Sequence, residues 1–308
     1  MSLNDTLKRL PVLDTLYELV ALARRNSATV ANFTARSGPQ YAYSLINVLI
    51  DEYLDTHLYR AARYAESGRL NRHEYQVFSQ NGEDGLIAEI FRRIGTTNSH
   101  FVEFGVENGL ETNTTHLFVK GWRGMWIEAD AKLVQAIRES FGTMIQSGRL
   151  HLANAFVTAE GIEGLMREAS IPQELDLLSI DIDGNDYWVW KAIENYRPRV
   201  VVVEYNATYR PDTEWIMKYD PKATWSRTSH YGASLKSLEL LGRRKGYSLV
   251  GCNFVGVNAF FVRNDLIQGQ FAEPFTAENH YEPFRLHLCR KTGHARGFGD
   301  FTTDGVAG

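Results

Sequence analysis

Apolar residues in the first part of the chain recur at helical spacing. Between positions 45 and 62 they form an unbroken stripe at i, i+3 and i+4, which predicts an amphipathic helix ending before Ser67-Gly68. Residues 3–25 carry the same period, interrupted by Pro11. We expect residues 1–75 to form a helical N-terminal extension. Two interpretations of it stay open: a cap on the main domain, or a functional element, either a substrate lid or an arm through which the chain forms a homo-oligomer.

From residue 78 the pattern changes to short apolar runs that alternate with amphipathic segments. The runs at 175–182 and 200–205 are almost continuously apolar, as the central strands of a parallel sheet are. Only the five residues NFVGV separate the last two runs, which is too short for a crossover helix and predicts an antiparallel hairpin. The expected strands are 100–106, 125–129, 150–156, 175–182, 200–205, 247–252 and 258–262.

This alternation predicts an α/β fold for residues 76–308. We expect a doubly wound, seven-stranded, mostly parallel Rossmann-like sheet with a C-terminal antiparallel hairpin. The residues from 297 to 308 are rich in Gly, Thr and Asp, which predicts a flexible C-terminal tail.

Composition narrows the classes of protein that fit this pattern. The 308 residues include 33 Lys and Arg against 37 Asp and Glu, a formal net charge of −4, which excludes a strongly basic nucleic-acid binder. Two cysteines, Cys252 and Cys289, are too few for a disulfide scaffold. There is no apolar run of about 18 residues, so we expect no membrane span. The N-terminus lacks a signal-peptide core, and we expect a soluble, cytoplasmic protein.

Polar residues stand at the end of the first predicted strand, where a parallel sheet binds its ligands. Residues 101–109 read FVEFGVENG, with Glu103 inside the strand and Gly105 and Gly109 in the turn after it. A dinucleotide-binding turn reads GxGxxG, and its middle glycine is absent here. The turn therefore suits a phosphate-free, zwitterionic nucleoside whose amino group Glu103 would hold. An ordinary tight turn is the alternative.

The next two strand ends add further polar groups. Glu128 ends the second strand 25 residues beyond Glu103, where a carboxylate accepts hydrogen bonds from ribose hydroxyls. Asn154 ends the third strand, within reach of an adenine edge. Polar groups at three consecutive strand ends favour a single nucleoside site over coincidence.

Four motifs follow one another between residues 79 and 128: SQNGEDG, FVEFGVENG, ETNT, and GWRG leading to WIE. In this order they resemble the FkbM family of S-adenosylmethionine-dependent methyltransferases, over residues 75–265. The resemblance implies a class I methyltransferase sheet, S-adenosylmethionine as methyl donor, and O-methylation of a small-molecule acceptor such as a sugar or natural-product hydroxyl. The donor-site residues that it implies are Glu103, Gly105, Gly109, Asn113, Glu128 and Asn154, with Gln80 and Glu83 near the amino-acid end of the donor.

Oxygen ligands gather at the fourth and fifth predicted strand ends. Adjacent strand ends converge, and hard oxygen donors suit Mg²⁺. The candidate ligands are Asp181, Asp183, Glu204 and Asn206, of which Asp181 and Asp183 are also the candidate catalytic residues. The arrangement resembles metal-dependent O-methyltransferases of the catechol and macrolide-sugar kinds, and an ion there would lower the pKa of the acceptor hydroxyl.

A second interpretation of these strand ends stays open. The stretch at 183–186, DGND, has the composition of a turn that caps the next helix, which explains Asn185 and Asp186. It does not explain Asp181, whose charge inside an apolar strand is costly. FkbM-like sequences more often continue with a Val-Glu-Gly-like stretch, so this part of the chain departs from the family pattern.

The segment 206–233 shows little periodicity but is rich in aromatic residues. Loops of this length are usually functional or disordered, and aromatic content argues against disorder. We expect it to form an acceptor-binding surface, with a decorative excursion as the alternative. His230 within it is a candidate general base, because histidine titrates near neutrality, and a structural role is the alternative.

These observations predict a class I S-adenosylmethionine-dependent methyltransferase, with O-methylation the favoured reaction and a divalent metal such as magnesium left open. Two rival hypotheses remain. A nucleotide-dependent oxidoreductase is disfavoured by the missing middle glycine. A non-catalytic binding or assembly module that keeps the fold is disfavoured by the intact set of polar strand ends.

Overall fold

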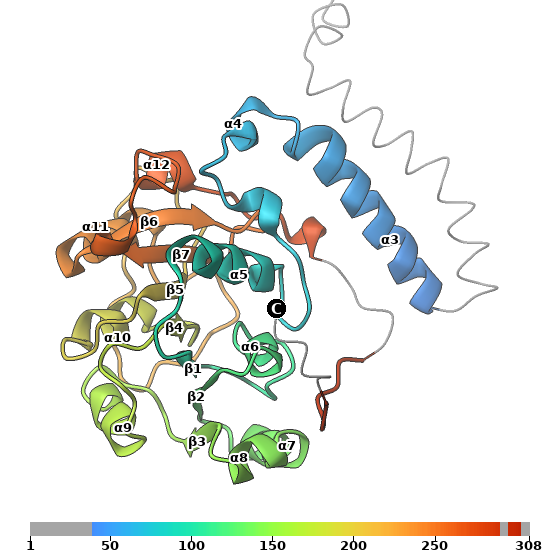
Figure 1. Ribbon diagram of the computed structural model, residues 1–308. Coiled ribbons are helices and arrows are strands. Elements are labelled where there is room, and N and C mark those ends of the chain that lie inside the picture. The colour runs from blue at the N-terminus through green and yellow to red at the C-terminus, as the bar shows by residue number, and fades with distance from the viewer. Residues whose placement is uncertain (1–38, 290–294, 303–308) are drawn as a thin grey trace, which may run out of the picture. The chain divides into compact units, whose positions relative to one another are not determined.

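The computed structural model describes residues 39–289 and 295–302, in which two compact units are distinguished. The first unit covers 1–54 and 290–295, and its described part is mainly helix α3 (Pro39–Tyr53) (Figure 1). The chain continues from α3 into one π-helical turn, η1 (Leu54–Leu58). The predicted stripe over 45–62 is thus helical as far as 58. The predicted helix at 3–25 lies outside the described residues, and self-association through this region stays a prediction.

The second unit covers 55–289 and 296–308, so it begins earlier than the predicted boundary at residue 75. Side chains from residues 59–75 form hydrogen bonds with later parts of this second unit, which contains the sheet and is called the sheet unit below. The Tyr64 hydroxyl donates to Glu282 Oε2 at 2.8 Å, and Asn71 Nδ2 donates to the Cys252 carbonyl at 2.9 Å. These contacts pair residues about 200 positions apart in the chain, which helical periodicity alone does not reveal.

The sheet of this unit has seven strands in the order β3-β2-β1-β4-β5-β7-β6. Strands β1 to β5 run parallel, and β7 is antiparallel to both of its neighbours, β5 and β6. The predicted fold class is therefore confirmed, including the hairpin. The strands are β1 (His100–Phe104), β2 (Arg123–Glu128), β3 (Leu150–Asn154), β4 (Leu177–Ile180), β5 (Val200–Glu204), β6 (Tyr247–Cys252) and β7 (Asn258–Arg263).

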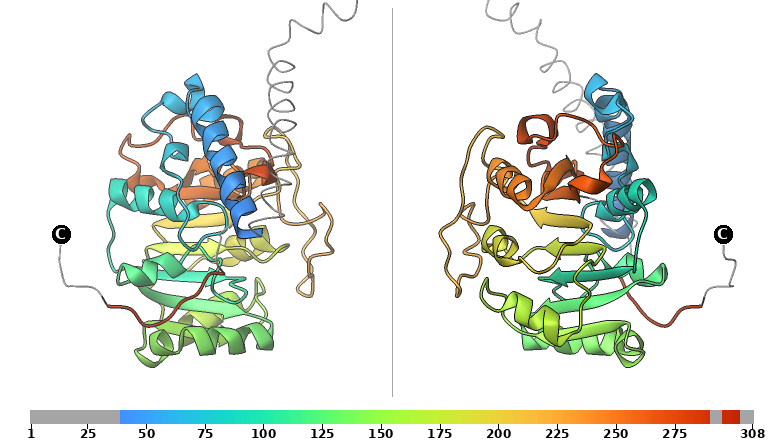
Figure 2. Two further views of the ribbon diagram at one scale, coloured as in Figure 1. Left: turned by 90° about the vertical axis from the view of Figure 1, so that its right-hand side faces the viewer. Right: turned by 60° about the vertical axis from the view of Figure 1, so that its left-hand side comes forward.

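Helices cover both faces of the sheet (Figures 1 and 2). One face packs on α5 (Glu83–Ile94), α6 (Thr115–Val119), α7 (Ala131–Ser140) and α8 (Gly142–Gln146). The other packs on α9 (Ile162–Glu168), α10 (Asp186–Ala192), α11 (Leu235–Lys245) and α12 (Ala277–His280). Fully buried strand residues alternate between the two cores, with Phe101 on the first side and Val102 on the second. This double cover is why β4 and β5 read as continuous apolar runs.

Short elements complete the described part of the chain. They are α4 (Ala62–Ala65) and the 3₁₀ turns η2 (Asn71–His73), η3 (Asn264–Leu266) and η4 (Leu286–Leu288). Arg296 and Phe298, around the start of the predicted tail, contact Phe78 and Phe141, and the flexibility of the tail stays a prediction. No helix among the described residues is both long and apolar enough to cross a membrane.

The chain order of the strands reverses between β1 and β4, which lie side by side at the centre of the sheet. In open α/β sheets the ligand crevice forms at the carboxyl ends of the strands at such a reversal. We therefore expect the functional site around the turns that follow β1, β2, β4 and β5.

Candidate functional site

The carboxylate of Glu103, on β1, is used inside the protein. Its Oε1 accepts the backbone N–H of Asn113 at 2.9 Å, and its Oε2 accepts the backbone N–H and the hydroxyl of Thr114. Burial raises the pKa of Glu103 to about 7, against the opposing effect of these hydrogen bonds. The side chain is 4% exposed. In the structure Glu103 thus holds the turn before α6, and the side-chain amide of Asn113 in turn donates to Ser179 Oγ at 3.0 Å.

Both predicted glycines after β1 have positive φ and sit in close contacts. A Cβ atom on Gly105, whose φ is 72°, would lie 1.7 Å from the Asp181 carbonyl oxygen. A Cβ on Gly109, at φ 79°, would lie 2.7 Å from the ring of Trp126. The first glycine therefore lets the ends of β1 and β4 approach each other at the crevice, and the second lets the turn pack on β2.

Glu107 occupies the place of the missing middle glycine, and sequence reasoning did not single it out. Its φ of 49° is in the left-handed region that a glycine would favour. Partial desolvation raises the pKa of its carboxyl, and the carboxylates of Glu111, Asp183 and Glu128 raise it further. A negative charge thus stands where a dinucleotide-binding turn opens its backbone to a pyrophosphate.

Glu128, at the end of β2, is held by two backbone amides. Its Oε1 accepts the N–H of Asp130 at 2.8 Å, and its Oε2 accepts the N–H of Glu107 at 2.9 Å. The amide of Asn154, at the end of β3, donates to the carbonyls of Glu128 and Ala129 at 2.9 and 3.0 Å. The ribose candidate is therefore fixed in orientation, and since each oxygen accepts one hydrogen bond from the described residues, each has a second lone pair for a ligand.

The SQNGEDG motif builds the loop before α5. Glu83 is fully buried: its Oε1 accepts from the amides of Asn253 and Asn258, and its Oε2 from the Asn81 N–H. Gln80 is exposed, and its carbonyl accepts from Gln76 Nε2 at 2.7 Å. Of the two residues predicted near the amino-acid end of the donor, only Gln80 presents its side chain to solvent.

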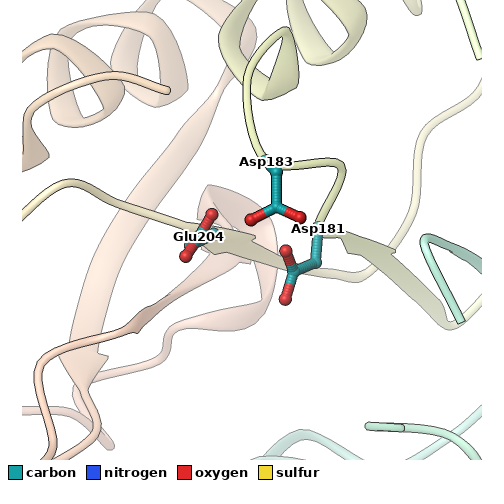
Figure 3. A group of neighbouring side chains, drawn as sticks. All are labelled: Asp181, Asp183 and Glu204. Carbon is teal, nitrogen blue, oxygen red and sulfur yellow. The ribbon is translucent and has the colours of Figure 1, made fainter. Parts of the chain in front are cut away.

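Asp181, Asp183 and Glu204 bring their carboxylates together at the ends of β4 and β5 (Figure 3). One oxygen from each lies within 4.8 Å of the others. We call these three side chains the acidic cluster. Figure 3 shows all three carboxylates turned toward a common space. Neither hydrogen bonds nor ion pairs reach them from the described part of the chain, and Glu204 Oε2 is buried without a partner.

The acidic cluster is electrostatically unfavourable in the absence of a cation. Burial raises the pKa values of Asp181 and Glu204 well above their usual range, and repulsion between the carboxylates raises them further. Partial desolvation also raises the pKa of Asp183, which is exposed and has a left-handed φ of 55°. Unpaired carboxylates in such surroundings either take up protons or bind a cation.

Two neighbouring polar residues have structural tasks instead. Asp186 accepts the N–H groups of Ile182 and Gly184, both at 2.9 Å, so this carboxylate holds the turn before α10. Burial raises its pKa to about 6. Asn206, a predicted metal ligand, is fully buried, and its amide donates to the carbonyls of Ser229 and Tyr231. The structure thus joins three of the four predicted ligands and assigns Asn206 to the loop.

The loop 206–233 makes contacts within itself and with helix α10. Ile216 pairs with Ala233 in an antiparallel bridge, and Trp188 Nε1 donates to the Met217 carbonyl at 2.8 Å. Tyr231 is 9% exposed; burial raises the pKa of its phenol, and the nearby charges of the acidic cluster add to this. The candidate base, His230, is exposed, and its ring stands edge-on to Trp215 with 5.4 Å between ring centroids.

Comparison with known proteins gives structural similarity alone. The chain matches no protein-family model and no curated protein sequence. Its fold is similar to that of an O-methyltransferase from Bacillus cereus in complex with SAH, at 14% identity and a TM-score of 0.41, over 72% of this chain and 100% of that chain. A magnesium protoporphyrin IX methyltransferase from Synechocystis with bound SAM is similar at 10% identity and a TM-score of 0.39, over 71% and 97%.

Proposed function

We propose that this protein is an S-adenosylmethionine-dependent O-methyltransferase acting on a sugar or natural-product hydroxyl. The observation that carries the proposal is the pair of carboxylate sites at one edge of a sheet with the order β3-β2-β1-β4-β5-β7-β6. Glu128 stands at the end of β2, and the acidic cluster stands at the ends of β4 and β5. The first suits a nucleoside, and the second suits the group that reacts with it.

Charge in the crevice supports S-adenosylmethionine over a dinucleotide. Glu107 stands where the pyrophosphate of a dinucleotide would bind, and its carboxylate would repel the phosphates, whereas Glu128 suits the ribose of either ligand. S-adenosylmethionine has no phosphate and carries a sulfonium cation. Under this proposal Glu128 accepts hydrogen bonds from the ribose hydroxyls, and the exposed Gly105 lets the donor approach the backbone of the turn.

We also propose that the acidic cluster holds a divalent cation such as Mg²⁺. Three hard oxygen donors within 4.8 Å of one another, including the orphaned Glu204 Oε2, fit such an ion. When bound, the ion would supply a positive charge that lowers the pKa of an acceptor hydroxyl. The ligand set that we propose is Asp181, Asp183 and Glu204, without Asn206, since its Nδ2 donates within the loop and its Oδ1 accepts the Thr208 N–H at 3.1 Å.

In the reaction the acceptor oxygen attacks the methyl carbon in line with the carbon–sulfur bond. That bond breaks, its electron pair passes to sulfur, and the hydroxyl proton passes from the acceptor oxygen to solvent water. Most of the acceleration comes from holding the two substrates in this geometry. Tyr231, within the 206–233 loop, is near enough to the acidic cluster for its charges to raise the pKa of the phenol, so this segment is the proposed acceptor-binding surface. We propose FkbM as the family, on the four motifs between residues 79 and 128.

Isothermal titration of the full chain with S-adenosylmethionine, in EDTA and in Mg²⁺, tests the proposal. We expect micromolar binding in both buffers, with competition by S-adenosylhomocysteine and none by NAD. Binding of NAD in place of S-adenosylmethionine would overturn the assignment in favour of an oxidoreductase. Binding of neither would favour a module without catalytic activity.

A further inference from the structure

The residues 296–301, which we name the C-terminal strap, pack on loops far away in the sequence (dark red in Figure 2). The guanidinium of Arg296 donates from Nη1 to the Phe78 carbonyl at 2.7 Å and from Nη2 to the Ser79 carbonyl at 3.1 Å. Nη1 also lies 3.2 Å from Glu111 Oε1. One cation thus joins the loop before α5 to the loop before α6.

Aromatic stacking fixes the strap beyond Arg296. The ring of Phe298 stacks on Phe141, with 4.4 Å between centroids and 19° between planes, and lies 6.0 Å from the ring of Phe118. Asp300 Oδ1 accepts a hydrogen bond from the Thr143 hydroxyl at 2.5 Å. The strap is therefore anchored to α6 and to the start of α8 by contacts of two kinds.

The two loops joined by Arg296 carry residues that the FkbM resemblance assigns to the methyl donor. Gln80 follows Ser79 directly, and Asn113 stands two positions after Glu111. We propose that the C-terminal strap positions these two donor-binding loops, with Arg296 as the positioning residue. The inference rests on the function proposed above, since it takes the loops to bind S-adenosylmethionine.

Arginine suits this task because its planar guanidinium offers several N–H donors at once. The side chain of Arg296 is 9% exposed, so its charge is taken out of water and has to be matched by carbonyls and a carboxylate. Truncating it leaves the carbonyls of Phe78 and Ser79 without this donor and Glu111 without its cation. A lysine at this position supplies a positive charge but lacks the planar set of N–H donors, so it restores only part of the contacts with the two carbonyls and Glu111.

Titration with S-adenosylmethionine tests the inference in four variants of the full chain. Two are truncations, one ending at Ala295 and the other at Thr302, and two are Arg296→Ala and Arg296→Lys. We expect at least a tenfold loss of affinity for the Ala295 truncation and for Arg296→Ala. The Thr302 truncation is the matched control and should keep wild-type affinity. The affinity of Arg296→Lys should lie between those of the wild type and Arg296→Ala. Wild-type affinity in both Arg296→Ala and the Ala295 truncation would overturn the inference.

Hydrogen exchange on the donor-free protein gives a second readout. The backbone N–H groups of Val77, Phe78 and Ser79 all donate to Asp84 Oδ2, so their exchange reports on the loop before α5. We expect these amides to exchange at least tenfold faster in Arg296→Ala, while those of β5 keep wild-type rates and show that the fold is intact. Unchanged exchange at all three amides contradicts the inference even if no donor binds. Faster exchange in a chain that binds no S-adenosylmethionine supports the strap and refutes the proposed function.

Discussion

The backbone N–H of Glu107 donates to Oε2 of Glu128 at 2.9 Å, which ties the turn after β1 to the end of β2. The same carboxylate accepts the N–H of Asp130 through Oε1, so it is oriented before any ligand arrives. Preorganisation of this kind lowers the entropic cost of binding. It also makes Glu128 the residue on which the proposed donor site depends most directly.

Substitution Glu128→Ala should weaken S-adenosylmethionine binding by at least about tenfold, roughly 1.4 kcal/mol. The variant loses the acceptors for the ribose and the bonds that fix the turn at Glu107. The exposed Glu139→Ala, on α7, removes a carboxylate of the same size and charge away from the crevice and serves as the control. Full affinity in Glu128→Ala, measured by isothermal titration, would refute the ribose assignment.

Mg²⁺ should raise the melting temperature of the wild-type protein, because a ligand that binds only the folded state stabilises it. At 100 times the dissociation constant the gain is about 2.7 kcal/mol. Asp183→Asn and Glu204→Gln should abolish the rise without lowering stability in EDTA, since each removes a repulsive carboxylate. The control is Asp212→Asn, which changes a 69% exposed carboxylate in the 206–233 loop outside the acidic cluster, and it should respond to Mg²⁺ as the wild type does. An equal response in all four proteins would place any ion elsewhere.

Most of the fold follows from patterns that are local in the sequence. The continuous apolar runs predict β4 and β5 because both faces of these strands are buried, and NFVGV is too short for anything but a hairpin between β6 and β7. The order of alternating elements then places Glu128, Asp181 and Glu204 at one edge of the sheet. The sequence thus predicts where these strands and carboxylates lie, and the structure places them there.

The tasks of individual carboxylates do not follow from position. Glu103 and Asp181 stand at neighbouring strand ends, yet the first accepts hydrogen bonds from Asn113 and Thr114, and the second accepts none from the described residues. The difference depends on how the turn before α6 closes over β1. The contacts of the C-terminal strap do not follow from local sequence either, because the Phe78 carbonyl to which Arg296 donates is 218 residues away in the sequence.

The buried carboxyl of Glu103 should make stability depend on pH in a definite direction. Its pKa is about 7 in the folded protein and takes the ordinary value of 4.5 in the unfolded chain, so between these values the folded state binds the extra proton. Its contribution to stability is therefore fully present below pH 4.5 and is lost as pH rises through 7. At 1.36 kcal/mol per pKa unit it amounts to about 3 kcal/mol.

The readout is the difference in free energy of unfolding between wild type and Glu103→Gln, measured with urea in EDTA at pH 5 and pH 8. The difference is needed because the buried His280, whose pKa is lowered to about 3, opposes the trend below pH 6.5. We expect the free energy of unfolding of the wild type, relative to that of the variant, to increase by up to about 3 kcal/mol when the pH is lowered from 8 to 5. A difference that is constant with pH would mean that Glu103 is ionised throughout this range in the folded protein.

The close approach of β1 and β4 predicts the outcome of Gly105→Ala. The new Cβ would lie 1.7 Å from the Asp181 carbonyl oxygen, so the backbone of one strand end has to move, and we expect a loss of more than about 3 kcal/mol in the free energy of unfolding. Gly148→Ala is a matched control, since its φ of 69° is close to the 72° of Gly105 but no atom lies within 4 Å of the added Cβ. The control should lose only the cost of a left-handed alanine, about 1 kcal/mol. Equal losses in the two variants, measured by urea unfolding, would mean that backbone conformation and not the contact with Asp181 sets the requirement for glycine. If Gly105→Ala still folds, its Mg²⁺ response should be reduced as well, because the displaced carbonyl belongs to a residue of the acidic cluster.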